Sequence, residues 1–317
     1  MASRLVGPPR LVVTTCLALA LLLGGCGTDT TPQVTPTEDA ASAFPVTVEA
    51  ANGKVTLEQR PSRIVSLSPT ATEMLFAIGA GDQVAAVDQD SNYPPGVPTT
   101  NLNGFEPNIE AIAGYEPDLV VASNETGNLE KSFTALGIPF LLQPAAIILD
   151  DTYEELDELG DVTGHPQESR DVVDSMVEEI AEIRDSLPTS DEPLTYFHEL
   201  DDTYFTATSK TFIGQVYATL GLVNIADEAK GAGSGYPQLS AEYILKADPD
   251  LIFLADTKCC NQSPETVANR PGWDQLTAVK HDGVILLDDD IASRWGPRVV
   301  DYLRTVAEAV AEAAGRM

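Results

Sequence analysis

The sequence predicts an α/β fold in which two lobes, each with a largely parallel central sheet, are joined by one long helix. Three observations lead to this prediction: strand and helix signals alternate along most of the chain, one phrase of sequence occurs twice, and a long amphipathic helix separates the two occurrences. The 317 residues suffice for two domains of about 100 to 150 residues each.

The first 26 residues have the pattern of an export leader. A basic start is followed by an apolar run over residues 11–23, which is too short to span a membrane comfortably. The run closes in "LLGGC", and small residues before Cys26 resemble the lipobox of bacterial lipoproteins, which implies that Cys26 carries lipid. The alternative is an ordinary leader with a chance cysteine. Residues 27–44, rich in Thr and Pro, predict a flexible tether.

Residues 45–165 form the predicted N-terminal lobe. Short runs rich in Val, Ile and Leu alternate there with helical patterns, as in a parallel sheet with crossover helices. The strands are expected at 63–67, 83–88, 118–122 and 138–142, and the helices at 70–79, 108–114 and 128–136.

Residues 166–188 predict the bridging helix. Its apolar side chains recur at helical spacing on one side, at Val172, Val173, Met176, Ile180 and Ile183. Pro188 and Pro193 end the helix, and a second α/β series begins at "LTYFHEL", so that residues 189–317 form the predicted C-terminal lobe.

The two series share a phrase. "EAIAGYEPDLVV" (110–121) and "EYILKADPDLIF" (242–253) both contain Glu, one residue, Ile, four residues and Pro-Asp-Leu before two apolar residues. Each describes a helix that ends before a proline and leads into a buried strand. The repetition predicts two related lobes with a cleft between them.

Composition excludes several classes of function. The net charge of −31 makes nucleic acid a poor partner. The three histidines, His165, His198 and His281, are scattered, so neither a metal site nor a cofactor is expected, although His198 near a strand end could face the cleft. Neither a Walker loop nor a G-x-S-x-G elbow occurs, and no enzyme is predicted.

Two cysteines remain after the leader and the anchor, Cys259 and Cys260. Their α-carbons are separated by about 3.8 Å, which is short for a disulfide. A bond between these neighbours and a pair of free thiols are both open alternatives.

Several segments together resemble the class III substrate-binding proteins of ABC importers. They are "RIVSLSPTATEMLFAIGAGDQVAAVD", "SNYPP", "NIEAIAGYEPDLVVAS", "FTATSKTFIGQVYATLGLVNIADE", "YPQLSAEYILKADPDLIFL" and "RWGPRVVD", in that order over about residues 60–310. The resemblance implies two α/β lobes bridged by one helix. It also implies a ligand such as cobalamin, a ferric siderophore or haem, and the cobalamin binders are the most similar.

The resemblance implies docking carboxylates, one on each lobe. Glu73 in "SPTATE" and Glu242 in "QLSAEYIL" match positions that pair with arginines of the permease. The structural alternative for Glu73 is a capping box with Thr70 at the start of a helix. An exposed carboxylate in a first helical turn can serve both roles.

The resemblance also implies cleft residues. Tyr93 and Tyr236 match positions where cobalamin binders present aromatic rings, and Phe105 and Tyr204 are further candidates whose alternative is internal packing. Arg294 and Trp295 lie in a loop that faces the cleft in the family, where a guanidinium beside an indole can hold an anion. The alternative for Arg294 is pairing with the acidic residues 288–290.

The sequence therefore predicts a receptor on the outer face of the cytoplasmic membrane, anchored by lipid. It would capture a ferric siderophore or a corrinoid and deliver it to an ABC permease and its ATPase. Two alternatives remain open, a sensory or adhesive lipoprotein with the same fold and a secreted two-lobed α/β enzyme.

Overall fold

The computed structural model describes residues 44–188 and 192–315. The predicted leader, the anchor Cys26 and all but the last residue of the predicted tether lie outside the described residues.

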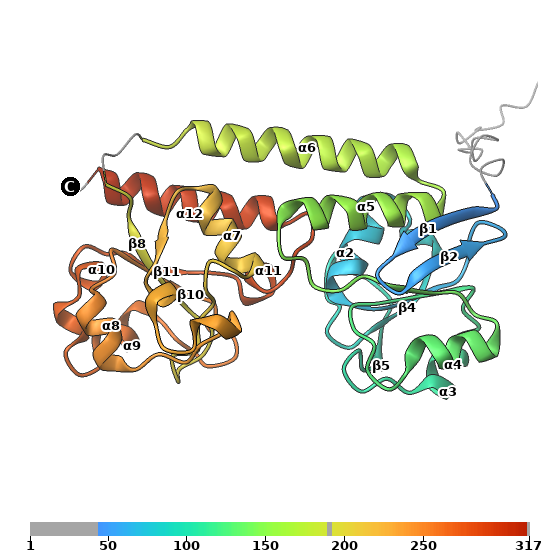
Figure 1. The fold of residues 1–317 in the computed structure, drawn as a ribbon, viewed down its shortest axis with the longest axis horizontal. Coiled ribbons are helices and arrows are strands. Elements are labelled where there is room, and N and C mark those ends of the chain that lie inside the picture. The colour runs from blue at the N-terminus through green and yellow to red at the C-terminus, as the bar shows by residue number, and fades with distance from the viewer. Residues whose placement is uncertain (1–43, 189–191, 316–317) are drawn as a thin grey trace, which may run out of the picture. The chain divides into compact units, whose positions relative to one another are not determined.

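The N-terminal lobe is built on a five-stranded parallel sheet (Figure 1). Its strands, in the order β5-β4-β3-β6-β7, are β5 (Thr99–Leu102), β4 (Val84–Asp88), β3 (Ile64–Leu67), β6 (Leu119–Ala122) and β7 (Phe140–Leu142). Every residue of β3 and β6 is buried, as expected for central strands that helices cover on both faces. The helices are α2 (Pro69–Ala77), α3 (Ile109–Ala113), α4 (Leu129–Leu136) and α5 (Leu149–Thr163).

A hairpin precedes this sheet and was not predicted. Strands β1 (Val46–Ala50) and β2 (Gly53–Leu57) pair antiparallel, and their inward residues Val48, Val55 and Leu57 join the apolar core. The sequence does contain the signal, because alternating apolar residues flank an Asn-Gly pair, and Gly53 adopts the positive φ of 99° that this turn requires. β5 was missed as well, since "TTNL" has little apolar character.

The predicted bridging helix is α6 (Pro166–Asp185), which passes along both lobes in Figure 1. Proline at its first position fits the helix start, where an amide hydrogen has no partner within the helix. Met176, Ile180 and Ile183 are buried, so the apolar side predicted from the spacing is the side that packs. α6 packs against α5 of the N-terminal lobe and against α12 (Val299–Ala314), the last helix.

The C-terminal lobe has a four-stranded parallel sheet. Its strands, in the order β11-β10-β8-β9, are β11 (Val284–Leu286), β10 (Leu251–Leu254), β8 (Thr195–Glu199) and β9 (Val223–Asn224). Its helices besides α12 are α7 (Phe212–Thr219), α8 (Ala241–Ala247), α9 (Pro264–Ala268), α10 (Thr277–Lys280) and α11 (Asp289–Ala292). Short 3₁₀ turns complete both lobes at η1 (Gly81–Gln83), η2 (Ile225–Glu228), η3 (Ala232–Ser234) and η4 (Trp273–Gln275).

The repeated Pro-Asp-Leu phrase has the same structural role in both lobes. Asp118 accepts hydrogen bonds from the backbone amides of Ser62 and Arg63, both at 2.8 Å, just before β3. Asp250 accepts one from the amide of Thr195 at 2.8 Å, at the start of β8. Each aspartate therefore links the N-terminal end of a central strand, β3 or β8, to the N-terminal end of the neighbouring strand in the parallel sheet. The strand order β4-β3-β6-β7 is repeated as β9-β8-β10-β11.

The predicted capping box of Thr70 and Glu73 is wrong. The N-cap of α2 is Ser68, whose hydroxyl accepts from the amide of Ala71 at 3.3 Å, and Pro69 occupies the first helical position. The proline fixes the helical φ two residues earlier than the prediction assumed. Glu73 therefore lies in the body of the helix, on a buried face.

Candidate functional site

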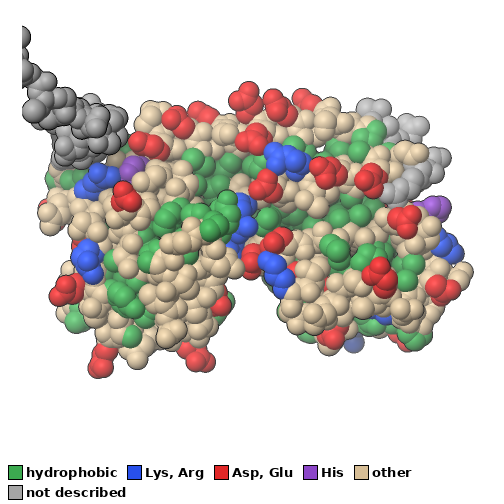
Figure 2. All heavy atoms as spheres, turned by 180° about the vertical axis from the view of Figure 1, so that it is seen from behind, with side chains coloured by type: hydrophobic (Ala, Val, Ile, Leu, Met, Phe, Trp, Pro, Cys, Tyr) green, Lys and Arg blue, Asp and Glu red, His purple; other side chains and the backbone are tan. Residues whose placement is uncertain are grey.

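The loops at the carboxyl ends of the strands carry the candidate cleft residues. In a parallel sheet these ends share one edge, where ligands bind in open α/β folds. The two edges meet, because Arg294 of the C-terminal lobe contacts Glu73 at 2.6 Å and the Asn92 amide donates to Asp290 at 3.1 Å. Figure 2 shows that the surface is hollowed between the lobes, with charged side chains at the innermost part of the hollow.

Glu73 is the centre of an ion-pair cluster between the lobes. Its side chain is buried, with only 3% of the residue exposed. One carboxylate oxygen pairs with Arg294 at 2.6 Å and with Arg298, and the other accepts from Arg298 Nε at 2.8 Å. Hydrogen bonding to Glu73 raises the pKa of Arg298. The predicted outward projection of Glu73 toward a permease is therefore wrong, because the carboxylate is enclosed by two arginines.

Arg294 is likewise engaged inside the protein. It is 8% exposed, and besides Glu73 it contacts the side chain of Asn92 at 2.9 Å, the carbonyl of Asp90 at 3.1 Å and the carboxylate of Asp290 at 3.3 Å. The prediction that Arg294 faces a ligand is contradicted, and the alternative of internal pairing is correct for Asp290.

Trp295 also bridges the lobes. Its indole nitrogen donates to Glu155 of α5 at 2.8 Å, and burial raises the pKa of that carboxyl to about 8. The partly buried ring packs against the main core, and the predicted ligand contact of Trp295 stays a prediction. Tyr93 keeps an exposed face: its ring lies over the guanidinium of Arg298 at 4.1 Å, beside a pocket of about 470 Å³ between α2, α6 and α12.

Three aromatic side chains are exposed on the loops of the carboxyl edges. Phe105 follows β5 and is 71% exposed, Tyr236 precedes α8 and is 49% exposed, and Phe205 follows β8 and is 39% exposed. Phe205 pairs with Gln238 across an antiparallel bridge, and Tyr236 stands two residues from Gln238. Phe205 and Tyr236 therefore share one face of a short ribbon. Phe105 and Tyr236 remain predicted ligand contacts.

Tyr204 packs internally, which was the alternative to its predicted ligand contact. The exposed ring belongs to its neighbour, Phe205. Tyr204 stacks on Trp273 with ring centroids 5.4 Å apart, and the guanidinium of Arg270 lies 5.3 Å from its ring. Its φ of 69° lies in the left-handed region, which a tyrosine seldom adopts, and a single sequence gives no signal for it.

A buried charged cluster underlies the C-terminal edge. Glu199, at the end of β8, forms a two-point ion pair with Arg270 at 2.5 and 2.6 Å. Asp256, two residues after β10, is fully buried with neither side-chain oxygen hydrogen bonded. Burial, followed by repulsion from Glu199, raises the pKa of Asp256 to about 7. None of these three residues was predicted from the sequence.

His198 does not face the cleft. It is fully buried, its Nδ1 lies 2.8 Å from the hydroxyl of Tyr217, and burial lowers the pKa of the imidazole to about 3. Across the described ranges 44–188 and 192–315, no group of three or more His, Cys, Asp or Glu side chains is placed to hold a metal ion.

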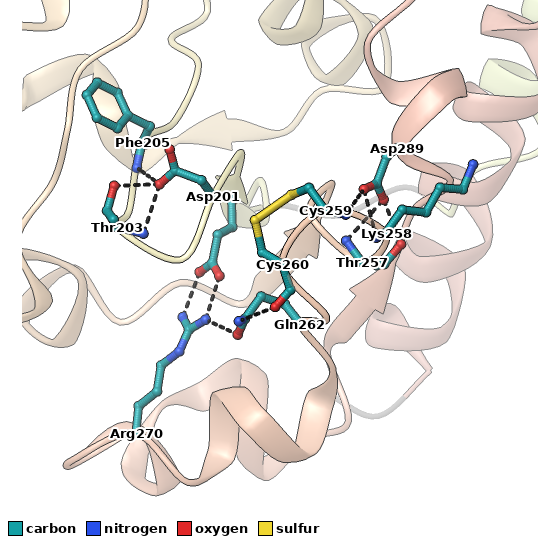
Figure 3. Close-up of a disulfide and its surroundings, with 11 residues drawn as sticks. Asp201, Thr203, Phe205, Thr257, Lys258, Cys259, Cys260, Gln262, Arg270 and Asp289 are labelled. Carbon is teal, nitrogen blue, oxygen red and sulfur yellow. Dashed lines mark hydrogen bonds and ion pairs between the residues drawn. A yellow bond between two sulfur atoms is a disulfide. The ribbon is translucent and has the colours of Figure 1, made fainter. Parts of the chain in front are cut away.

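Cys259 and Cys260 form a disulfide, which resolves the alternative that the sequence left open. The bond lies in the loop after β10, with Cys259 exposed (Figure 3). Because β10 lies between β8 and β11, this loop is flanked by the loop that carries Phe205 and by the segment that carries Asp289.

The repeated phrase places an exposed carboxylate at the start of a helix in each lobe. Glu242 lies in the first turn of α8, where Ser240 is the N-cap, and it is exposed. Glu110 has the same place in α3, where Asn108 is the N-cap, and it is exposed as well. Glu110 and Glu242 open the two copies of the phrase, so they hold the same position in the two lobes.

Comparisons with known proteins agree with this architecture. The family model described as periplasmic binding protein matches residues 64–291. A substrate-binding lipoprotein of an ABC transporter from Bacillus subtilis, YvrC, is 29% identical over 93% of this chain and 94% of its own. A cobalamin-binding protein from Halobacterium salinarum is 32% identical over 86% of this chain and 75% of its own.

Solved structures share the fold. The vitamin B12-binding protein BtuF of Vibrio cholerae superposes with a TM-score of 0.67 at 28% identity, covering 80% of this chain and 98% of that one. Among the described residues, no helix is both long and apolar enough to cross a membrane. With two parallel-sheet lobes joined by one long helix, this chain belongs to the periplasmic binding protein family and has the fold of its class III substrate-binding proteins.

Proposed function

We propose that this protein captures a corrinoid between its lobes and delivers it to an ABC permease. The observation that carries the proposal is the contrast between exposed aromatic rings and neutralised arginines at the carboxyl edges. Phe105, Phe205 and Tyr236 offer flat apolar faces, which suit a large macrocycle.

The arginines argue against a strongly anionic ligand. Arg270, Arg294 and Arg298 are all held in ion pairs with buried carboxylates, so their charges are already compensated. A ferric catecholate siderophore is strongly anionic and haem carries two propionates, and capture of either would require cations that are free to pair with it. A corrinoid needs fewer such partners. The similarity to a cobalamin-binding protein over 86% of the chain supports the same choice.

Titration with cyanocobalamin, ferrichrome and haem, followed by calorimetry, tests the ligand. We expect saturable one-to-one binding of cyanocobalamin, weak or no binding of the other two, and recovery of the chelate unchanged. Phe105→Ala and Tyr236→Ala should each weaken binding about tenfold. Leu136→Ala is the matched control, because this exposed residue ends α4, before β7 begins, at the opposite edge of the sheet. Binding of haem or ferrichrome alone would overturn the corrinoid assignment, and chemical turnover of the chelate would favour an enzyme.

We propose Glu110 and Glu242 as the docking carboxylates of the two lobes. Both are exposed in a first helical turn, and within residues 44–188 and 192–315 neither forms an ion pair. At a partly desolvated contact with a permease, loss of one carboxylate would leave an arginine of the partner unpaired.

Uptake measurements test the docking proposal separately from ligand binding. Glu110→Ala and Glu242→Ala should retain the affinity for cyanocobalamin and strongly reduce its uptake, and the Lys variants should be worse. Glu265→Ala is the control, because Glu265 is also fully exposed in the first turn of a helix, α9, but lies outside the repeated phrase. Normal uptake by the Glu110→Ala, Glu242→Ala double variant would contradict the docking proposal, whereas absence of uptake with the wild-type protein would favour a sensory or adhesive role.

We also propose that Cys26 is lipidated and holds the receptor at the outer face of the cytoplasmic membrane. The sequence "LLGGC" and the lipoprotein relative from Bacillus subtilis support this. Cys26→Ser should release the protein from the membrane fraction, and mass spectrometry of the mature N-terminus checks the modification. An unchanged lipid-modified mass would contradict the anchor.

A further inference from the structure

The disulfide between Cys259 and Cys260 has no evident role in holding the fold together. A disulfide stabilises a protein mainly by closing a loop in the unfolded chain, and its effect grows with the number of residues enclosed. This bond joins neighbours in sequence and therefore encloses no intervening residue. It also lies in an exposed loop at the carboxyl edge and not in the core.

One side of this loop is held by a single carboxylate. Asp289 accepts hydrogen bonds from the backbone amides of Thr257, Lys258 and Cys259, at 3.0, 2.8 and 3.3 Å. Figure 3 shows these amides gathered around the carboxylate. The turn that presents Cys259 is thus fixed by main-chain contacts, which do not involve the sulfur atoms.

The other side rests on the buried ion pair of the lobe. The side-chain amide of Gln262 makes two contacts: its Nε2 donates to the backbone carbonyl of Cys260 at 3.1 Å, and its Oε1 accepts from Arg270 at 2.7 Å. Arg270 is in turn held by Glu199. The loop therefore has supports at both ends that do not depend on the disulfide (Figure 3).

The loop lies where the two lobes meet. Lys258, the residue before the disulfide, contacts Asp290 through Nζ at 2.8 Å, and the same carboxylate oxygen accepts from Asn92 of the N-terminal lobe at 3.1 Å. The side chain of Lys258 therefore reaches the seam, and the disulfide follows Lys258 in the same loop at the carboxyl edge of the C-terminal sheet.

The chemistry of the bond suits a contact with a ligand. A disulfide has no hydrogen to donate, is weakly polar, and locks two side chains into one rigid apolar surface. Two free thiols in the same place would be mobile and would ionise in part to thiolates, which are strong ligands for transition metals. The oxidised pair thus offers a packing surface, whereas the reduced pair offers competing metal ligands.

We propose that the Cys259–Cys260 disulfide is a ligand-contact element that packs against the apolar surface of the bound metal chelate. This inference rests on the proposed function, because it requires a chelate between the lobes. Loss of a contact of this size should weaken binding about tenfold. The bond should matter little for folding.

The experiment compares full-length wild type with the Cys259→Ser, Cys260→Ser double variant, titrated with cyanocobalamin, ferrichrome and haem. We expect the double variant to bind the chelate that the wild type binds, with an affinity about tenfold lower. Its melting temperature should lie within about 3 °C of that of the wild type. Wild type that has been reduced and freed of reductant should also bind more weakly. The double variant treated in the same way controls for the reagent.

Each outcome decides between the proposals. Equal affinity in the two proteins overturns this inference and leaves the proposed function intact. A melting temperature lowered by more than about 10 °C shows that the bond is structural, which also overturns the inference. If wild type binds none of the three chelates, the proposed function fails and the inference fails with it.

Discussion

The two lobes share one framework but differ at the carboxyl edges of their sheets. In the N-terminal lobe β3 ends at Leu67, paired with Ala122, inside an apolar cluster. In the C-terminal lobe the equivalent end of β8 is Glu199, paired with Leu254 and buried with Arg270. The same topology therefore accepts a leucine or a buried ion pair at one position.

This difference shows that the buried ion pair of the C-terminal lobe fixes the orientation of side chains more than it stabilises the fold. Burial of an ion pair is opposed by desolvation, so the pair adds little free energy compared with apolar packing. What the C-terminal lobe gains is a fixed orientation for Arg270, which holds Gln262 and through it the loop of the disulfide. The apolar end at Leu67 supports no comparable loop.

The largest effect is expected when the buried pair is broken on one side. Arg270→Met should lower the free energy of unfolding by about 3 to 5 kcal/mol, because Glu199 is left buried without its cation. Adding Glu199→Leu, which gives this lobe the residue type of Leu67, should recover most of the loss. Urea denaturation measures both, and a double variant as unstable as the single one would contradict the equivalence of the lobes.

The next largest difference in stability is expected between the Ala variants of two glutamates of the N-terminal lobe. Glu73→Ala should cost about 2 to 4 kcal/mol, because it removes the shared partner of Arg294 and Arg298 at a buried seam. Glu110→Ala should change stability by less than about 0.5 kcal/mol, since Glu110 is exposed. The same denaturation assay compares them, and similar losses would show that burial of Glu73 has been overstated.

Each lobe also contains a carboxyl group that makes stability depend on pH. Burial raises the pKa of Glu155 from 4.5 to about 8 and that of Asp256 from 3.8 to about 7. In both cases the folded protein binds the proton more tightly than the unfolded chain does. Stability is therefore highest below the unfolded pKa and decreases as pH rises through the window up to the folded pKa.

Uncharged amide variants of the two carboxyl groups separate the pH ranges over which each one lowers stability. Glu155→Gln should remove the part of the decrease that extends to about pH 8, and Asp256→Asn the part that ends near pH 7, each by roughly 1 to 3 kcal/mol. Free energies of unfolding at pH 5, 7 and 8 give the profile. A variant that keeps the slope of wild type would exclude that carboxyl as its source.

A further, modest loss of stability should be the same in both lobes. Asp118→Ala and Asp250→Ala each remove the carboxylate that ties the first strand to its neighbour, and each should cost about 1 to 2 kcal/mol. Unequal losses, measured side by side in urea, would show that the repeated phrase has acquired a different role in one lobe.

Periodicity was enough to predict most of the fold. Local residue patterns, each contained in a short stretch of sequence, are enough to predict the buried strands β3, β4 and β6 and the amphipathic helix α6. The β1–β2 hairpin was missed although its Asn-Gly turn was present, because the segment was taken as the start of a lobe without strands of its own.

The site was harder to predict because its contacts join distant positions. Glu199 and Arg270 are 71 residues apart, and Glu73 and Arg294 are 221 apart, so no local pattern connects them. Glu73 was assigned to the surface because helix propensity does not say which neighbour covers a face. Glu110 could have been found, since it opens the same repeated phrase as Glu242.

The seam around Glu73 has a consequence for recombination between relatives. A chimera that joins one protein's N-terminal lobe to another's C-terminal lobe would combine carboxyl-edge loops from two parents. Such a hybrid would separate Glu73 from the arginines with which it pairs in this protein, because Arg294 and Arg298 lie in the other parent's segment. Productive crossovers should therefore carry residues 288–298 together with α2, so that modular exchange in this fold follows the seam and not the bridging helix.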